Sequence, residues 1–155
     1  MENKIINTNI AVCTFDELSS EYRQLIEEAK KQTEKAYAPY SNFQVGSAIL
    51  LENQLVIGGN NQENVACPSG LCAERVGVFY ANSQYPDVPI SAIAVAAFTN
   101  GDFTSLPVNP CGACLQVLIE SEMRQKKDIT LLLYGKENVH IIKSIKECLP
   151  LYFKF

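Results

Sequence analysis

The chain has 155 residues, of which 47% are hydrophobic, and this length and composition predict one globular domain over residues 1–155. Its formal net charge of −4 argues against binding to nucleic-acid phosphates, which calls for a basic surface, so we expect a small neutral ligand and no nucleic-acid partner. The longest apolar run, residues 90–98, is too short to span a bilayer, so we expect no membrane partner.

The first elements are predicted from weak alternation followed by a clear helical pattern. Residues 1–18 are expected to form an N-terminal arm or edge strand, because β-branched residues recur within them. A helix is predicted to begin at Ser19 or Ser20, either of which can cap it, and to extend to about residue 36, because apolar residues repeat at helical spacing. Pro39 then excludes further helix, because the residue before a proline is pushed out of the helical region.

The remainder of the chain alternates between predicted strands and helices. Apolar runs predict five strands, over residues 44–51, 55–59, 90–99, 129–134 and 139–142. Helical spacing predicts helices over residues 72–82, burying Val76, Phe79 and Tyr80, and over 111–123, with Leu115, Val117, Leu118 and Met123 available for burial. A capping box from Ser144 to Glu147 predicts a short last helix, closed by Pro150. This order favours an α/β fold in which helices cover a mixed sheet.

Six cysteines in a chain of this size raise the question of disulfides. The first residues, Met1 to Lys4, are polar and do not resemble the apolar core of a signal peptide. We therefore expect a cytoplasmic location with reduced thiols, where metal binding is the more common use of clustered cysteines.

Three of the cysteines and one glutamate are arranged as a zinc site with an acid–base group beside it. Cys111 and Cys114 have the spacing to bind one metal from the first turn of a helix, and Cys72 can supply a third thiolate. Three protein ligands leave one position for water, as in catalytic rather than structural zinc sites. Glu74 lies two residues after Cys72, where its carboxylate can take a proton from that water without binding the metal.

The same residues resemble the signature of zinc-dependent deaminases, in which a Cys or His is followed by Glu and later by Pro-Cys-x-x-Cys. Residues 38–46, Ala-Pro-Tyr-Ser-Asn-Phe-Gln-Val-Gly, look like the substrate loop of small cytidine deaminases, and residues 59–64 look like their ribose-binding segment. The resemblance covers residues 20–153. It implies a three-layer α/β/α sandwich with a mixed five-stranded sheet, one Zn²⁺ per subunit and a homotetramer. The implied activity is hydrolytic deamination of cytidine and deoxycytidine to uridine and deoxyuridine, with release of ammonia, in pyrimidine salvage.

The resemblance also implies roles for residues that the metal motif alone does not single out. Phe43 would stack on the substrate base, and Asn61 and Glu63 would hydrogen-bond the 3′-hydroxyl side of the ribose. Ala73 is a further substrate-binding position, and Phe153 would reach the pocket of a neighbouring subunit. Because three thiolates give a zinc centre a net charge of −1, we expect Arg75 to offset that charge by hydrogen-bonding Cys72 or Cys111.

Two positions depart from the pattern of these relatives. Cys67 stands where many of them have a tyrosine that helps line the pocket, and Leu115 stands where many have an arginine directly after the third cysteine. We interpret Cys67 as a packing residue, since the three-ligand site is complete without it.

Other functions remain open from the sequence. A related zinc deaminase could act on another nucleoside, such as blasticidin S. A non-enzymatic zinc-stabilised interaction module would need a fourth protein ligand, for which Cys67 is the nearby candidate. A thiol oxidoreductase could use Cys111 and Cys114 but would leave Glu74 without a function.

Overall fold

The computed structural model describes residues 1–154. Its helices and strands are, in chain order, β1 (Ala11–Cys13), α1 (Ser20–Thr33), β2 (Gln44–Leu51), β3 (Val56–Asn60), α2 (Ala73–Gln84), β4 (Ile90–Thr99), β5 (Asp102–Phe103), α3 (Gly112–Gln125), β6 (Thr130–Tyr134) and β7 (Val139–Ile142). Three short 3₁₀ turns cover Phe15–Glu17, Cys67–Ser69 and Ile145–Glu147. No helix within residues 1–154 is both long and apolar enough to cross a membrane.

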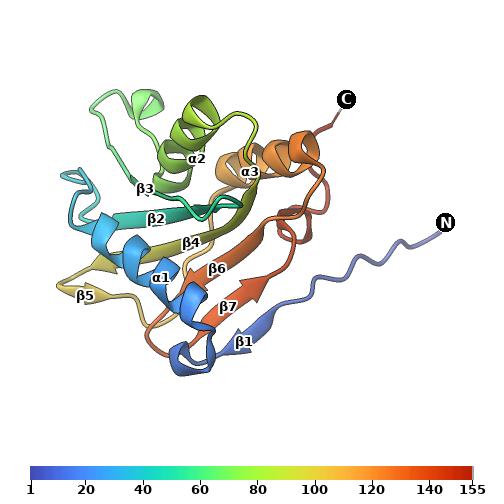
Figure 1. Ribbon diagram of the computed structural model, residues 1–155, viewed down its shortest axis with the longest axis horizontal. Helices are drawn as coiled ribbons and strands as arrows, with labels where there is room; N and C mark the ends of the chain where they lie inside the picture. Colours follow the sequence, from blue (N-terminus) through green and yellow to red (C-terminus); the bar gives the residue numbers. More distant parts are fainter. Residues whose placement is uncertain (155) are drawn as a thin grey trace.

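The strands form one mixed sheet with the order β1-β7-β6-β4-β2-β3, and β5 pairs with the end of β4 (Figure 1). Only β4 and β6 run parallel among the paired strands of the described residues. All five predicted strands are present, and the predicted α/β fold is confirmed. The predicted strand number was too low, because the short strands β1 and β5 extend the sheet to seven strands. Of the N-terminal arm, only Ala11–Cys13 joins the sheet, pairing with β7 at its edge.

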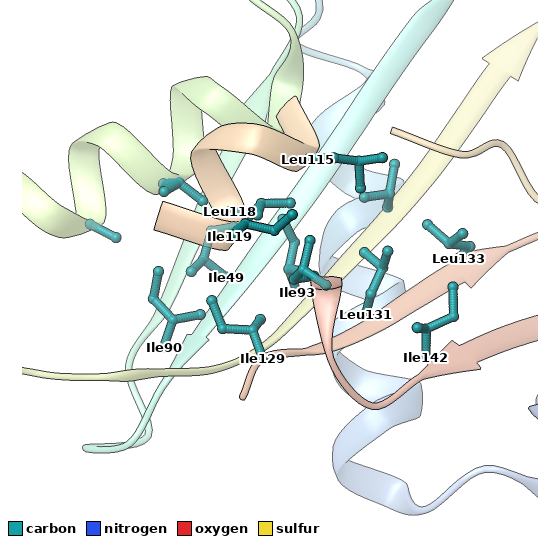
Figure 2. Close-up of a cluster of buried hydrophobic side chains, with 14 of the residues drawn as sticks. Ile49, Ile90, Ile93, Leu115, Leu118, Ile119, Ile129, Leu131, Leu133 and Ile142 are labelled. Carbon is teal, nitrogen blue, oxygen red and sulfur yellow. The ribbon is translucent and has the colours of Figure 1, made fainter. Parts of the chain in front are cut away.

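Helices cover both faces of the sheet, which gives the expected three layers (Figure 1). The side chains of a strand alternate between faces, so neighbouring residues contribute to different clusters. On one face, α1 packs on small side chains of β2 and β4 together with Leu50 and Leu132. On the other face, α2 and α3 cover a cluster of larger side chains that includes Ile49, Ile93 and Leu131 (Figure 2). Helix α1 lies closest at Gly46 of β2, where an added Cβ would lie 2.0 Å from the Ala29 carbonyl oxygen of the helix.

Three predicted core residues are exposed instead. Phe79 and Tyr80 on α2 are 46% and 55% exposed, and Met123 on α3 is 39% exposed. On α2 the face toward the sheet is occupied by Gly77, Val78 and Ala81, because small residues permit the close approach of this helix, and this turns the two aromatic rings outward.

The C-terminal helix predicted from Ser144 is also wrong, because the segment forms a single 3₁₀ turn, Ile145–Glu147, whose N-cap Ser144 makes no side-chain cap bond. The Ser144 hydroxyl instead donates to Glu122 Oε2 of α3 at 3.0 Å. Glu122 Oε1 accepts from the backbone N–H groups of Ile129 and Ile145, both at 2.8 Å. This carboxylate is 1% exposed, so it fastens the end of α3 to the start of β6 and to the C-terminal segment.

Candidate metal centre and substrate pocket

The three cysteines of the predicted metal site are brought together at two helix N-termini. Cys72 is the N-cap residue of α2, Cys111 is the N-cap residue of α3, and Cys114 lies in the first turn of α3. The free N–H groups and partial positive charge of a helix start favour thiolates at both positions. Cysteines far apart in the sequence therefore meet because both helices begin at the same part of the molecule.

The separations of the sulfur atoms fit one tetrahedral zinc ion. The Sγ atoms of Cys72 and Cys111 are 3.9 Å apart, and those of Cys111 and Cys114 are 3.5 Å apart. Zinc–sulfur bonds of about 2.3 Å at tetrahedral angles would place the sulfurs about 3.8 Å from one another. Within residues 1–154, these three cysteines are the one group of three or more His, Cys, Asp or Glu side chains with metal-binding geometry. The predicted ligand set is thus assembled by the fold.

The electrostatics of the cluster favour a thiolate at Cys72. A hydrogen bond from Cys114, with further hydrogen bonds from Arg75 and Cys111, lowers the pKa of Cys72 to about 5. The same coupling to Cys72 raises the pKa of Cys114, to which burial also contributes. Cys72 therefore ionises easily, while the thiols of Cys114 and Cys111 donate hydrogen bonds to it.

Glu74 lies in the first turn of α2 and is 4% exposed. Burial raises the pKa of its carboxyl, and the negative charge of Cys72 acts in the same direction. The Glu74 backbone N–H, the Cys114 thiol and Arg75 oppose this by stabilising the carboxylate. The arrangement places a buried carboxyl group beside the sulfur cluster.

Arg75 contacts the cluster directly. Its guanidinium donates to Cys72 Sγ at 3.7 Å, so the structure makes one of the two contacts that the sequence allowed. Its Nε atom is buried without a hydrogen-bond partner among the described residues. A group of fixed positive charge thus faces the thiolates, where it can offset their combined charge.

The start of α2 lies very close to strand β3, and this closeness depends on Gly59. A Cβ atom at Gly59 would lie 2.4 Å from the Ala73 carbonyl oxygen and 2.6 Å from the Gly77 nitrogen. The hydroxyl of Ser47 on β2 donates to the same Ala73 carbonyl at 2.9 Å. Gly77 is itself tightly packed, since an added Cβ would lie 2.9 Å from a side-chain carbon of Ile49.

Replacing Gly59 by alanine is expected to push the first turn of α2 away from the sheet. We expect a loss of about 1–3 kcal/mol in the free energy of unfolding and less than one zinc per chain, because Cys72 moves with the helix. Urea unfolding and a zinc determination measure both effects. Gly112→Ala is the control, because an added Cβ there meets nothing within 4 Å. Equal stability and zinc content in the two variants would contradict the expectation.

A pocket of about 450 Å³ opens beside the sulfur cluster. It is lined by Cys72 and Arg75 on one side and by Asn61, Glu63 and Tyr40 on another. The polar residues predicted to bind ribose therefore share a cavity with one of the metal ligands. Three other predicted substrate residues, all within the described part of the chain, are not among those that line it: Phe43, Ala73 and Phe153.

Phe43, Ala73 and Phe153 lie outside the lining of this pocket, each in a different environment. Phe43 is half-buried directly before β2, and Ala73 is fully buried in the first turn of α2. Phe153 is 67% exposed, and the Gln116 side chain holds its backbone by two hydrogen bonds of 3.0 Å. This clamp on Phe153 was not anticipated, because Gln116 is separated from it by 37 positions.

Asn61 and Glu63 are already engaged with the loop before β2. Asn61 Oδ1 accepts from the Val45 backbone N–H at 2.8 Å, and its Nδ2 donates to the Phe43 carbonyl at 2.9 Å. Glu63 accepts from the backbone N–H of Tyr40 at 2.9 Å and from both the N–H and the hydroxyl of Ser41. Ser41 lies inside the motif of residues 38–46 but was not singled out from the sequence.

The two departures from the deaminase pattern have different environments. Cys67 is exposed and lines the pocket, so its interpretation as a packing residue is not supported. It does not belong to the metal-binding group found within residues 1–154. Leu115 is 8% exposed and packs with the core cluster beneath α3, where its apolar side chain is well accommodated.

Comparison with known proteins agrees with this geometry. Residues 19–127 match the family model described as the cytidine and deoxycytidylate deaminase zinc-binding region. Two relatives named cytidine deaminase, from Sporosarcina psychrophila and Halalkalibacterium halodurans, are each 46% identical over 97 and 98 residues. These matches span 63% of this chain in both cases, and 67% and 70% of the relatives.

Solved structures extend the similarity to most of the fold. The crystal structure of cytidine deaminase from Burkholderia pseudomallei superposes with a TM-score of 0.72 at 39% identity, covering 85% of this chain and 98% of that one. Cytidine deaminase from Mycobacterium tuberculosis gives a TM-score of 0.69 at 28% identity, covering 88% of this chain and 100% of the other.

Proposed function

Because this chain belongs to the family of cytidine and deoxycytidylate deaminases, we propose that it catalyses zinc-dependent hydrolytic deamination of cytidine and deoxycytidine, a reaction of pyrimidine salvage. The products would be uridine or deoxyuridine and ammonia. The observation that carries the proposal is the meeting of three cysteine sulfurs within 4.8 Å of one another beside the buried carboxylate of Glu74.

Cys72, Cys111 and Cys114 would hold one zinc ion per subunit, which supplies a Lewis acid that makes water easier to deprotonate. Glu74 acts as the general base and takes a proton from the water as its oxygen bonds to C4 of the cytosine ring. Glu74 gives this proton to N3. It then transfers the remaining hydroxyl proton to the amino group, and the C4–N bond breaks to release ammonia. One water is consumed, and the C4 carbonyl of the uracil ring is formed.

Separate residues are proposed to recognise the ribose and the base of the substrate. Asn61 and Glu63 would bind the 3′-hydroxyl side of an unphosphorylated ribose, Phe43 would stack on the base, and Ala73 would contact it from the start of α2. A carboxylate that accepts from a sugar hydroxyl discriminates strongly against analogues that lack that group. Glu63 suits this function because its hydrogen bonds with Ser41 and Tyr40 lower the pKa of its carboxyl.

The direct test is loss of the cytosine-amine absorbance with purified protein, alongside a zinc determination. We expect turnover of cytidine and deoxycytidine, with little turnover of the monophosphate or of blasticidin S. Preferred turnover of blasticidin S would favour the related-deaminase alternative. Loss of zinc from Cys67→Ala without any deaminase activity in the parent protein would favour the non-enzymatic zinc module.

Arg75→Ala is expected to lower kcat by about tenfold to a hundredfold, the size expected for loss of a hydrogen bond to a charged group. The physical reason is that the thiolates keep more negative charge, so deprotonation of water becomes harder, whereas ribose binding depends on other residues. KM for cytidine should change by no more than about twofold, because Arg75 contacts the cysteine sulfurs whereas other residues are proposed to bind the ribose. Arg124→Ala, in the last turn of α3, is the control, and an unchanged kcat for Arg75→Ala would remove Arg75 from the mechanism.

We also propose that the chain is a single domain that assembles as a cytoplasmic homotetramer. The exposed rings of Phe79 and Tyr80 on α2 support burial of that face against another subunit, since exposed aromatic clusters commonly mark interfaces. In that assembly Phe153 would reach the pocket of a neighbour. Light scattering coupled to size-exclusion chromatography measures the subunit number directly.

A further inference from the structure

A single hydroxyl group connects the two sides of the proposed substrate site. The Ser41 Oγ atom donates to Glu63 Oε1 at 2.5 Å and accepts from the Phe43 backbone N–H at 3.0 Å. Glu63 lies on the segment that follows β3, whereas Phe43 directly precedes β2. Ser41 therefore bridges the residue proposed to bind the sugar and the residue proposed to stack on the base.

The surrounding loop is fixed independently at several points, which gives Ser41 a defined position. The Asn42 backbone has a positive φ of 53°, its N–H donates to the Ala38 carbonyl at 3.0 Å, and its carbonyl accepts from the Thr99 hydroxyl at 3.1 Å. Asn61 ties the Phe43 carbonyl to the segment after β3. On a loop held in this way, the Ser41 hydroxyl has little freedom to choose other partners.

The hydrogen bonds of Glu63 leave room for a ligand. The carboxylate has about four acceptor positions. Two are used at Oε2 by the backbone N–H groups of Tyr40 and Ser41, and one is used at Oε1 by the Ser41 hydroxyl. The remaining acceptor position on Oε1 is available to a hydroxyl of the substrate. The direction in which this position points depends on how the Glu63 carboxylate is rotated, and the hydrogen bond from Ser41 fixes that rotation.

We propose that Ser41 is a positioning residue for nucleoside binding. Its hydroxyl orients the Glu63 carboxylate toward the 3′-hydroxyl of the ribose and fixes the position of the Phe43 backbone relative to that carboxylate. This inference rests on the proposed function, because it requires that Glu63 binds the sugar. It makes Ser41 a determinant of sugar specificity that acts through Glu63, with no part in proton transfer.

The test compares cytidine with 3′-deoxycytidine in steady-state kinetics. In Ser41→Ala, KM for cytidine should rise about tenfold to a hundredfold, the size expected for loss of one hydrogen bond to a charged group, while kcat changes little. The ratio of kcat/KM for cytidine to that for 3′-deoxycytidine should fall by a similar factor. This ratio does not depend on the folded fraction of the protein, so it remains informative even if the variant is less stable.

Three further variants isolate the hydroxyl and its partner. Ser41→Thr keeps a hydroxyl and should retain the parent ratio, and Ser20→Ala, at an exposed position at the start of α1, is the matched control. Glu63→Ala should lower the ratio strongly, and adding Ser41→Ala to it should lower the ratio no further, because Ser41 acts through Glu63.

The outcomes separate this inference from the proposed function. If the parent protein deaminates cytidine but Ser41→Ala leaves the ratio unchanged, or lowers KM, the inference is wrong and the function stands. A full additional loss of the ratio in the double variant would likewise show that Ser41 acts independently of Glu63. If the zinc-loaded parent protein deaminates neither nucleoside, the proposed function fails and this inference fails with it.

Discussion

Glu74→Gln is expected to lower kcat by at least about 10⁴-fold, because both proton transfers of the proposed reaction use this one carboxylate. Glutamine has nearly the same shape but does not accept and return a proton at neutral pH. Zinc content and thermal stability should be retained, since Glu74 is not a ligand and its buried position suits a neutral side chain. Stopped-time assays with high enzyme concentration would measure the residual rate.

The control for this substitution removes a similar charge from a similar place. Glu21 lies in the first turn of α1, as Glu74 lies in the first turn of α2, so Glu21→Gln changes a helix start without touching the site. Its kcat should equal that of the parent protein. A Glu74→Gln protein with full zinc and a rate within tenfold of the parent would reject Glu74 as the proton carrier.

The second large effect concerns stability, at the opposite end of α3 from the cysteines. Glu122→Ala leaves three donors without their acceptor: the backbone N–H groups of Ile129 and Ile145 and the Ser144 hydroxyl. A buried donor without a partner costs about 1–3 kcal/mol, so we expect a total loss of about 3–5 kcal/mol in the free energy of unfolding. Urea unfolding monitored by circular dichroism measures this loss.

Glu120 provides the matched control because it lies two residues earlier on α3 and is exposed. Glu120→Ala should change the unfolding free energy by no more than about 0.5 kcal/mol. A small effect of Glu122→Ala, similar to that control, would mean that water replaces the carboxylate at little cost. The C-terminal segment would then be held by its packing and by its other hydrogen bonds, such as those between Gln116 and Phe153.

The sequence was sufficient for those elements whose pattern is local. Strand β4 and strand β2 were predicted with their observed ends, because continuous apolar runs bounded by turn residues are distinctive. The cysteine cluster was predicted because its motif is short and its residues are chemically unusual. By contrast, the two residues of β5 are too few to carry a pattern, and their pairing depends on a turn after β4.

Features that depend on contacts distant in sequence were missed for a common reason. The partners of Glu122 lie up to 23 positions away, and Ser41 meets Glu63 across 22 positions, so no local pattern indicates either. The outward rings of Phe79 and Tyr80 were also missed, because the hydrophobicity of a residue alone does not show which side of a helix faces the sheet.

The positions of Cys72 and Cys111 at two helix N-termini have a consequence for the stability of both helices. The N-cap residues of α2 and α3 are Cys72 and Cys111, and neither makes a side-chain capping bond. An ion that joins their sulfurs crosslinks positions 39 residues apart, and closing a loop of that length can contribute about 4 kcal/mol by restricting the unfolded chain. Chelation should therefore fray the first turns of both helices together, with amide hydrogen exchange accelerating there while the central strands remain protected.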